Sequence, residues 1–386
     1  MSGRVFAYHA KNGKFLNVMR GAARIGLARA QGNPSACEAD RALDRGPDGA
    51  GEDGVPAAPT DPVPPDLARI RATAARLAGR IARTPILEWT APEITARLPR
   101  GTRVVLKLEL FQHTGSFKVR GALATLLEAP AEALARGVTA VSAGNHAIAT
   151  AWAAREVGTS AEVVMLASAS PARVEKVRRY GGRVVPAPDV QTAFALVEKV
   201  VAEQGRLLVH PFEGEGPALG SATLGLEWLD QAAPLDAVIV PIGGGGLAAG
   251  LAAAVEQASP TTLVFGVEPE GADSMARSLE AGSPQRLERV ATIADSLGAP
   301  FALPYSFGLC RRFLEGVVRI PDAAMLEAVR LYFDGLKLAC EPAGAAALAA
   351  LLGPLRERLA GARVGVLVCG SNIDPEGFAR LLAGGG

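Results

Sequence analysis

The sequence predicts an α/β protein whose parallel sheets carry helices on both faces. From Asp66 onward, short apolar runs that fit buried strands alternate with Ala-rich stretches that fit helices, and this alternation is typical of parallel sheets. No repeat period is visible, which argues against a solenoid. With 386 residues, 49% of them hydrophobic, the chain can bury a large core and form roughly two to three domains.

The individual elements follow from this pattern. The expected strands are Thr102–Leu108, Val138–Val141, Ala161–Leu166, Arg183–Val185, Leu207–Val209, Ala237–Val240, Leu263–Val267 and Val364–Val368. The expected helices are Val119–Leu127, His146–Glu156, Pro171–Tyr180, Ala193–Glu203, Leu247–Gln257, Ala323–Leu338 and Pro342–Leu359.

Composition excludes several classes of function. A net charge of +1 without a basic cluster argues against a nucleic-acid partner, and no apolar run approaches the roughly 18 residues of a membrane span. The four cysteines are far apart and form no CxxC pair, so neither a disulfide framework nor a zinc site is indicated. We therefore expect a cytoplasmic enzyme whose partner is a small molecule.

The first 65 residues differ from the rest. No acidic residue precedes Glu38, and a stretch rich in Gly, Pro and Asp runs from Arg45 to Pro65. This composition predicts a disordered tail over residues 1–65. An organelle transit peptide is the alternative, although the segment lacks the serine content of such peptides.

Lys118 lies in a turn rich in small and hydrogen-bonding residues. The expected strand that ends at Leu108 precedes this turn, and the expected helix that begins at Val119 follows it. Since α/β proteins build their sites at the carboxyl ends of strands, the pattern predicts a functional amine here.

The segment Lys107-Leu-Glu-Leu-Phe-Gln-His-Thr-Gly-Ser-Phe-Lys-Val-Arg-Gly-Ala122 resembles the cofactor-lysine motif of the threonine dehydratase and serine racemase family. These are fold-type II enzymes that use pyridoxal 5'-phosphate. The resemblance implies that Lys118 is catalytic and carries the cofactor as a Schiff base, with Phe117 as a further contact. It also implies a two-lobed fold like that of tryptophan synthase β, with a small lobe at 131–211 and a large lobe at 66–130 and 212–386.

The segment Ser142-Ala-Gly-Asn-His146 follows one expected strand and opens a helix. Free backbone N–H groups at a helix start attract a carboxylate or a phosphate, although Ser142 could equally be an ordinary helix cap. In the family that it resembles, this loop holds the substrate carboxylate and its asparagine touches the cofactor ring. The implied substrate contacts are Ser142, Ala143, Gly144, Asn145 and His146, and Asn145 is also an implied cofactor contact.

Four consecutive glycines lie between an expected strand and an expected helix, in Pro241-Ile-Gly-Gly-Gly-Gly-Leu247. Successive N–H groups without Cβ atoms can surround an anion, most naturally a phosphate. The segment is neither GxGxxG nor a Walker motif, which disfavours dinucleotides and nucleoside triphosphates. It resembles the family's loop for the cofactor phosphate, which implies cofactor contacts at Gly243, Gly244, Gly245, Gly246 and Leu247.

Near the C-terminus, Val368-Cys-Gly-Ser-Asn-Ile-Asp374 resembles a family segment whose first residue, a serine or threonine, touches the pyridine nitrogen of the cofactor. Here that residue is Cys369, and a neutral thiol is a weak hydrogen-bond donor. The alternative is a small buried cysteine that makes no such contact.

Three further residues depart from the family pattern. Ala143 replaces the serine that handles protons in the racemases, which disfavours racemisation. Phe212 stands where some relatives have an asparagine. The family's divalent-cation site, made of a glutamate, a carbonyl and an aspartate, would map to Glu268, Ala272 and Ser274. Ser274 replaces the aspartate, which makes the metal site doubtful because Ca²⁺ and Mg²⁺ need several oxygen ligands.

Together the motifs predict a lyase of amino-acid metabolism that converts L-threonine or L-serine to a 2-oxo acid and ammonia. The alternatives are a dehydratase for 3-hydroxyaspartate, phenylserine or an ectoine-catabolism substrate, a serine racemase, a β-replacement synthase, and a non-catalytic protein that binds a phosphate ligand. The family also implies a homodimer or a higher homo-oligomer.

Overall fold

A computed structural model describes residues 62–383 of the chain. The strands are β1 (Ile86–Trp89), β2 (Arg103–Leu108), β3 (Val138–Val141), β4 (Ala161–Leu166), β5 (Arg183–Ala187), β6 (Leu207–Leu208), β7 (Ala237–Pro241), β8 (Leu263–Pro269), β9 (Gly316–Ile320) and β10 (Arg363–Val368). The α-helices are α1 (Leu67–Leu77), α2 (Pro92–Thr95), α3 (Lys118–Glu128), α4 (Ala131–Arg136), α5 (Asn145–Glu156), α6 (Pro171–Arg179), α7 (Val190–Gln204), α8 (Glu215–Ala232), α9 (Gly246–Ala258), α10 (Ser274–Ala281), α11 (Pro304–Phe313), α12 (Asp322–Leu336), α13 (Pro342–Leu352) and α14 (Pro375–Ala383). Three short 3-10 helices are η1 (Glu109–Phe111), η2 (His113–Gly115) and η3 (Asp295–Leu297).

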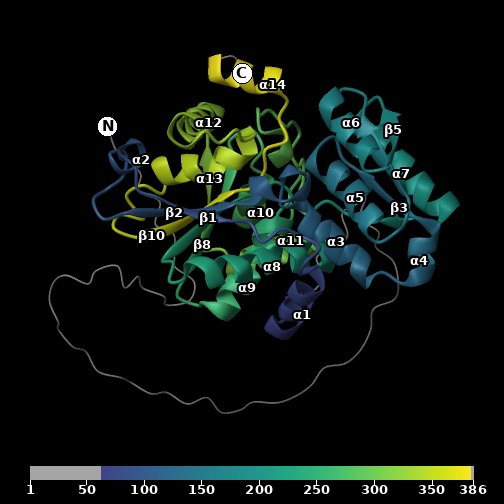
Figure 1. Cartoon of the computed structure of the whole chain (residues 1–386), viewed down its shortest axis with the longest axis horizontal. Helices are drawn as coiled ribbons and strands as arrows, with labels where there is room; N and C mark the ends of the chain where they lie inside the picture. Colours follow the sequence, from purple (N-terminus) through teal and green to yellow (C-terminus); the bar gives the residue numbers. More distant parts are fainter. Residues whose placement is uncertain (1–61, 384–386) are drawn as a thin grey trace, which may run out of the picture. The chain divides into compact units, whose positions relative to one another are not determined.

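The larger sheet has six strands in the order β1-β2-β10-β7-β8-β9. All neighbours are parallel except β1, which pairs antiparallel with β2. Helices α12 and α13 lie on one face of this sheet, and α8 and α9 lie on the other (Figure 1). The central strands are buried on both faces, which explains why they appear in the sequence as continuous apolar runs.

The smaller sheet has four parallel strands in the order β5-β4-β3-β6. It lies between residues 138 and 208, within the range expected for a small lobe, and α5, α6 and α7 pack around it (Figure 1). The lobe boundaries themselves stay a prediction.

The α/β class with parallel-rich sheets is therefore confirmed. The helix expected over Pro342–Leu359 is shorter in the structure, where α13 ends at Leu352. Gly353 leaves helical geometry, and Pro354 has no N–H group to continue the hydrogen-bond ladder. The predicted tail over residues 1–65 lies outside the described residues, apart from residues 62–65.

The structure of residues 62–383 bears on two expectations from composition, which concern membrane-spanning segments and disulfide bonds. None of the helices in this range is long and apolar enough to cross a membrane. Cys310, Cys340 and Cys369 are buried and unpaired, so no disulfide joins them.

A buried cluster of charges joins β2, α3 and α8 beneath the start of α3. Arg120 binds Glu109 through two hydrogen bonds of 2.9 and 2.8 Å, and it also contacts Glu227 at 3.0 Å. Lys107 donates to Glu227 at 2.5 Å and to the Thr84 carbonyl at 2.8 Å. Although burial alone would lower the pKa of Arg120, the two carboxylates raise it above its ordinary value. Each charge is thus held by a partner of opposite sign.

Removing one member of this cluster should be costly. Glu109→Ala leaves Arg120 buried with only one carboxylate, and we expect the free energy of unfolding to fall by about 3–5 kcal/mol, measured by urea denaturation. The matched control is Glu175→Ala, which removes an exposed pair with Arg179 and should cost less than about 1 kcal/mol. Equal losses in the two variants would show that the buried cluster adds no special stability.

Candidate active site

The carboxyl ends of β2, β7 and β10 place three sequence motifs around one cavity. The backbone N–H of Phe117 donates to the Cys369 carbonyl at 3.1 Å, and Ser116 forms an isolated bridge with Gly370. The Lys118 turn is thereby attached to the end of β10. The glycine loop follows β7, the neighbour of β10.

The cavity has an empty volume of about 430 Å³, part of which is open solvent. Its lining includes all nine of the predicted cofactor contacts, namely Phe117, Lys118, Asn145, Gly243, Gly244, Gly245, Gly246, Leu247 and Cys369. Residues far apart in the sequence therefore share one space. That they bind a cofactor stays a prediction at this point.

Lys118 is the first residue of α3, and its amine is placed for chemistry. Its Nζ atom donates to the Pro211 carbonyl at 2.5 Å and lies 5.1 Å from the centre of the Phe117 ring. Burial lowers the pKa of Lys118 to about 8. About a tenth of this amine is therefore unprotonated at pH 7, and the fraction rises to about half near pH 8.

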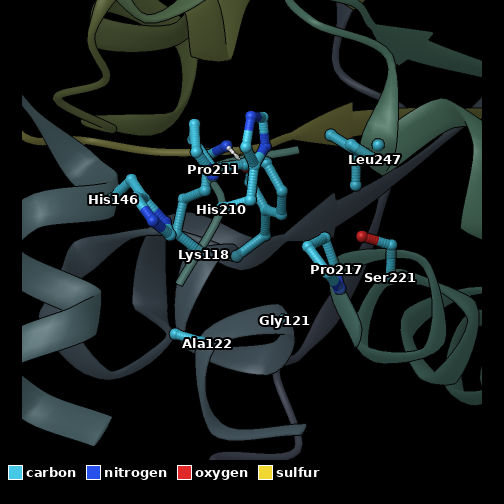
Figure 2. A pocket seen from close by; sticks show the side chains of 11 residues that line it. Lys118, Gly121, Ala122, His146, His210, Pro211, Pro217, Ser221 and Leu247 are labelled. Carbon is cyan, nitrogen blue, oxygen red and sulfur yellow. Dashed lines mark hydrogen bonds between the residues drawn. The ribbon is translucent and has the colours of Figure 1, made fainter. Parts of the chain in front are cut away.

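Two histidines lie near this amine (Figure 2). Burial and the nearby Lys118 charge lower the pKa of His146 to about 3 and that of His210 to about 4. His146 Nε2 is 2.7 Å from the Val209 carbonyl, and His210 Nδ1 accepts the N–H groups of Phe212 and Glu213. Both rings are therefore neutral near neutral pH, whereas the pKa of the Lys118 amine lies close to it.

Asn145 is held on both sides of its amide. Its Nδ2 atom donates to Glu341 Oε1 at 2.6 Å, and its Oδ1 atom accepts from Asn372 Nδ2 at 2.6 Å. Ser296 and Arg173 in turn contact the second oxygen of Glu341, at 3.1 and 3.5 Å. These contacts fix Asn145 at the start of α5, where it faces the cavity.

The sequence patterns did not reveal Glu341, Ser296 or Arg173 as part of the site. Glu341 precedes α13, Ser296 lies in η3, and Arg173 lies in α6, so only the folded chain brings them together. Pro342, which directly follows Glu341, indicated where the helix starts. Nothing in the local sequence indicated that Glu341 contacts Asn145.

The loop from Ser142 to His146, predicted to bind the substrate, lies at the start of α5. Asn145 and His146 are buried, whereas Ser142, Ala143 and Gly144 are half-buried. The Ser142 hydroxyl accepts the N–H of Gly144 at 3.1 Å. The structure therefore forms the turn that the sequence predicted, with the backbone N–H groups of a helix start next to the cavity.

The glycine loop is packed too tightly for side chains. A Cβ atom on Gly244 would lie 2.2 Å from the Phe212 ring, and one on Gly246 would lie 2.2 Å from the Phe212 carbonyl oxygen. Because α9 begins at Gly246, its first N–H groups have no partner within the helix. Such a loop is built to surround an anion.

Cys369 lines the cavity as a buried thiol. Burial raises its pKa well above the ordinary value, so the sulfur is neutral, and it is 3.4 Å from the Ala343 carbonyl, to which it donates. The sequence predicted a weak donor at this position. Contact with a pyridine nitrogen stays a prediction.

The acidic side chains at the doubtful metal site are engaged with other groups of the protein. The two carboxylate oxygens of Glu268 accept the N–H groups of Met275 and Ala276 at 2.9 and 2.8 Å, and Ala272 is buried beside them. Asp273 is bound by Arg277 and Arg319. Among residues 62–383, no group of three or more His, Cys, Asp or Glu is arranged to hold a metal ion.

Several known proteins are similar to this chain in sequence and in structure. A family model described as "Pyridoxal-phosphate dependent enzyme" matches residues 77–370. Phenylserine dehydratase from Ralstonia pickettii is 52% identical over 82% of this chain and 96% of its own length. The structure of a threonine deaminase from T.th. gives a TM-score of 0.75 at 40% identity, over 80% of this chain and 99% of that one. Maize serine racemase gives a TM-score of 0.78 at 33% identity, over 83% and 98%.

Gly246→Ala tests the anion cradle. The new methyl group meets the backbone of Phe212, so the loop must move, and hydrogen bonds to a charged group are worth about 1.5–3 kcal/mol each. We expect the pyridoxal phosphate content of the purified variant to be at least about 10-fold lower than that of the wild type, measured by absorbance after alkaline release. Gly316→Ala, where a Cβ meets no atom within 4 Å, is the control. Normal cofactor content in Gly246→Ala would contradict the assignment.

Proposed function

This chain belongs to the family of pyridoxal-phosphate dependent enzymes, and from that membership we propose that it removes ammonia from a 3-hydroxy amino acid. The net products are a 2-oxo acid and ammonia. Elimination of the β-hydroxyl releases one water molecule, and hydrolysis of the resulting enamine consumes one. The single observation that carries the proposal is that the Lys118 amine shares one cavity with Asn145 and the glycine loop.

The residues present fit the cofactor. The glycine loop forms part of the cavity wall, and it would hold the phosphate. Close packing leaves no room for Cβ atoms on this loop. Lys118 would hold the aldehyde carbon, Asn145 would contact the ring oxygen, and Cys369 would face the ring nitrogen. When bound, pyridoxal phosphate withdraws electrons from the carbon that loses its proton.

Lys118 is the general base of the proposed reaction. Its unprotonated amine accepts the α-proton of the substrate, and the resulting ammonium group returns a proton to the departing β-hydroxyl, which leaves as water. The N–H groups at the start of α5 hold the substrate carboxylate. The enamine product is then hydrolysed to the 2-oxo acid and ammonia.

An aromatic substrate, 3-phenylserine, is the first candidate. Support comes from the 52% identity with a phenylserine dehydratase and from Phe212, an aromatic side chain in the cavity wall. L-Threonine and L-serine are the second candidate, supported by the 40% identity with a threonine deaminase. The test is to incubate the holoenzyme with each substrate and to measure phenylpyruvate, 2-oxobutanoate, pyruvate and ammonia. Ammonia from none of them would contradict the proposal.

Racemisation is disfavoured. Ala143 has no hydroxyl to deliver a proton to the opposite face of the substrate, and His146 is neutral and engaged with the Val209 carbonyl. A homodimer or higher oligomer, and a cytoplasmic location, stay predictions.

Lys118→Ala should abolish turnover, because the base is removed. We expect ammonia release to fall by at least about 100-fold, the lower end of what general-base catalysis contributes. The absorption band of the Schiff base between the cofactor and this lysine should also disappear. Lys199→Ala, on the exposed face of α7, is the control and should retain both signals. Retained activity in Lys118→Ala would exclude this lysine as the base.

The pH dependence of kcat follows from the lowered pKa of Lys118. Below about pH 8 the amine is mostly protonated and has no lone pair to accept a proton, so kcat should be low. As the pH rises through about 8, kcat should increase and then level off. A kcat that is flat or falls between about pH 7 and 9 would contradict the role of this amine.

A further inference from the structure

Three phenylalanines form a row that begins in the cavity wall, and we call Phe194, Phe212 and Phe301 the aromatic row. The centres of the Phe212 and Phe301 rings are 6.2 Å apart, and those of Phe301 and Phe194 are also 6.2 Å apart. Both distances are typical of interacting aromatic pairs. Phe212 lines the cavity beside Gly244, so one end of the row belongs to the site.

The aromatic row is not part of a core. All three side chains are half-buried, and within residues 62–383 none of them packs with the hydrophobic core clusters. Phe117, the other aromatic residue of the cavity wall, does pack against the main core. Partly exposed aromatic rings that lie outside the core and reach a cavity can serve as a binding surface.

Two members of the row are held firmly in place. The Phe212 carbonyl accepts the Ser306 hydroxyl at 2.8 Å, and its N–H donates to His210. Phe301 forms a β-bridge with Arg286, whose guanidinium carbon lies 5.0 Å from the ring centre. A surface fixed before binding loses little conformational entropy when a ligand arrives.

The row also joins two parts of the chain. Phe194 comes from α7, which packs on the four-stranded sheet, whereas Phe301 follows η3, which borders the glycine loop. The row therefore brings together aromatic rings from both parts of the chain.

The polar positions of the cavity are already assigned. The carboxylate of the substrate faces the start of α5, its α-carbon must lie near Lys118, and the glycine loop holds the phosphate. The lining residues left for the β-substituent are Phe212, Pro241, Ser296, Leu297 and Ala343, and Phe212 is the aromatic side chain among them. We propose that the aromatic row binds the aryl side chain of a 3-aryl-3-hydroxy amino acid and thereby determines substrate specificity. The inference rests on the proposed function.

A methyl substituent would gain little from such a row, because a single methyl group covers a small part of one ring. A phenyl ring can pair with Phe212 by edge or by offset stacking. The row should therefore favour aryl over methyl side chains.

Binding can be measured separately from turnover. L-Phenylalanine and L-alanine lack the β-hydroxyl, so neither can lose water, and their dissociation constants report binding alone. The experiment is calorimetric titration of the holoenzyme with both amino acids, for the wild type, Phe212→Leu, Phe301→Leu and Phe301→Tyr. Phe378→Leu is the control, since that ring packs on Phe333 and the main core. The ratio of kcat/KM for 3-phenylserine and L-threonine is measured in parallel.

The wild type should bind L-phenylalanine at least about 10-fold more tightly than L-alanine. Both leucine variants should lose about 10-fold in affinity for L-phenylalanine and less than about 2-fold for L-alanine, and Phe301→Tyr should restore most of the loss. Equal losses for both ligands, or an unchanged preference, would overturn the inference. If ammonia is never released but the preference depends on the row, the proposed reaction fails while the aryl site stands.

Discussion

The buried pairing of Arg120 with Glu109 is the constraint on which the site depends. Arg120 lies two residues after Lys118 on the first turn of α3, and Glu109 directly follows β2. Their paired hydrogen bonds fix the start of the helix to the end of the strand. Glu227 and Lys107 extend the contact to α8. Because an unpaired charge at this depth would be very costly, the helix start has one favourable position, and that position places the Lys118 amine in the cavity.

The parallel sheet then brings the remaining groups to the same edge. The strands β2, β10 and β7 are neighbours, so the Lys118 turn, Cys369 and the glycine loop meet although they are far apart in the sequence. This arrangement follows the general rule that open α/β sheets bind ligands beyond the carboxyl ends of their strands. Asn145 begins α5, which packs on the smaller sheet, and it is held by Glu341, which precedes α13 on the larger sheet. The site therefore needs both sheets.

The central strands could be predicted because burial on both faces leaves a continuous apolar run. The strands β1 and β9 were missed because both are edges of the larger sheet and only partly buried. Helix α8 was missed because its three internal glycines and Pro217 obscure a helical pattern. Motifs identified Lys118 and the glycine loop. The contacts of Glu341 and Phe301 join separate segments, and no local pattern encodes them.

The most direct test of the account is the visible absorption spectrum of the purified holoenzyme before and after addition of 3-phenylserine, with phenylpyruvate and ammonia assayed in the same sample. We predict an absorption band from the cofactor bound at Lys118, which shifts on addition while phenylpyruvate and ammonia appear in equal amounts. A band that stays unchanged, with no product from 3-phenylserine or L-threonine, would contradict the assignment of this site to 3-hydroxy amino acids.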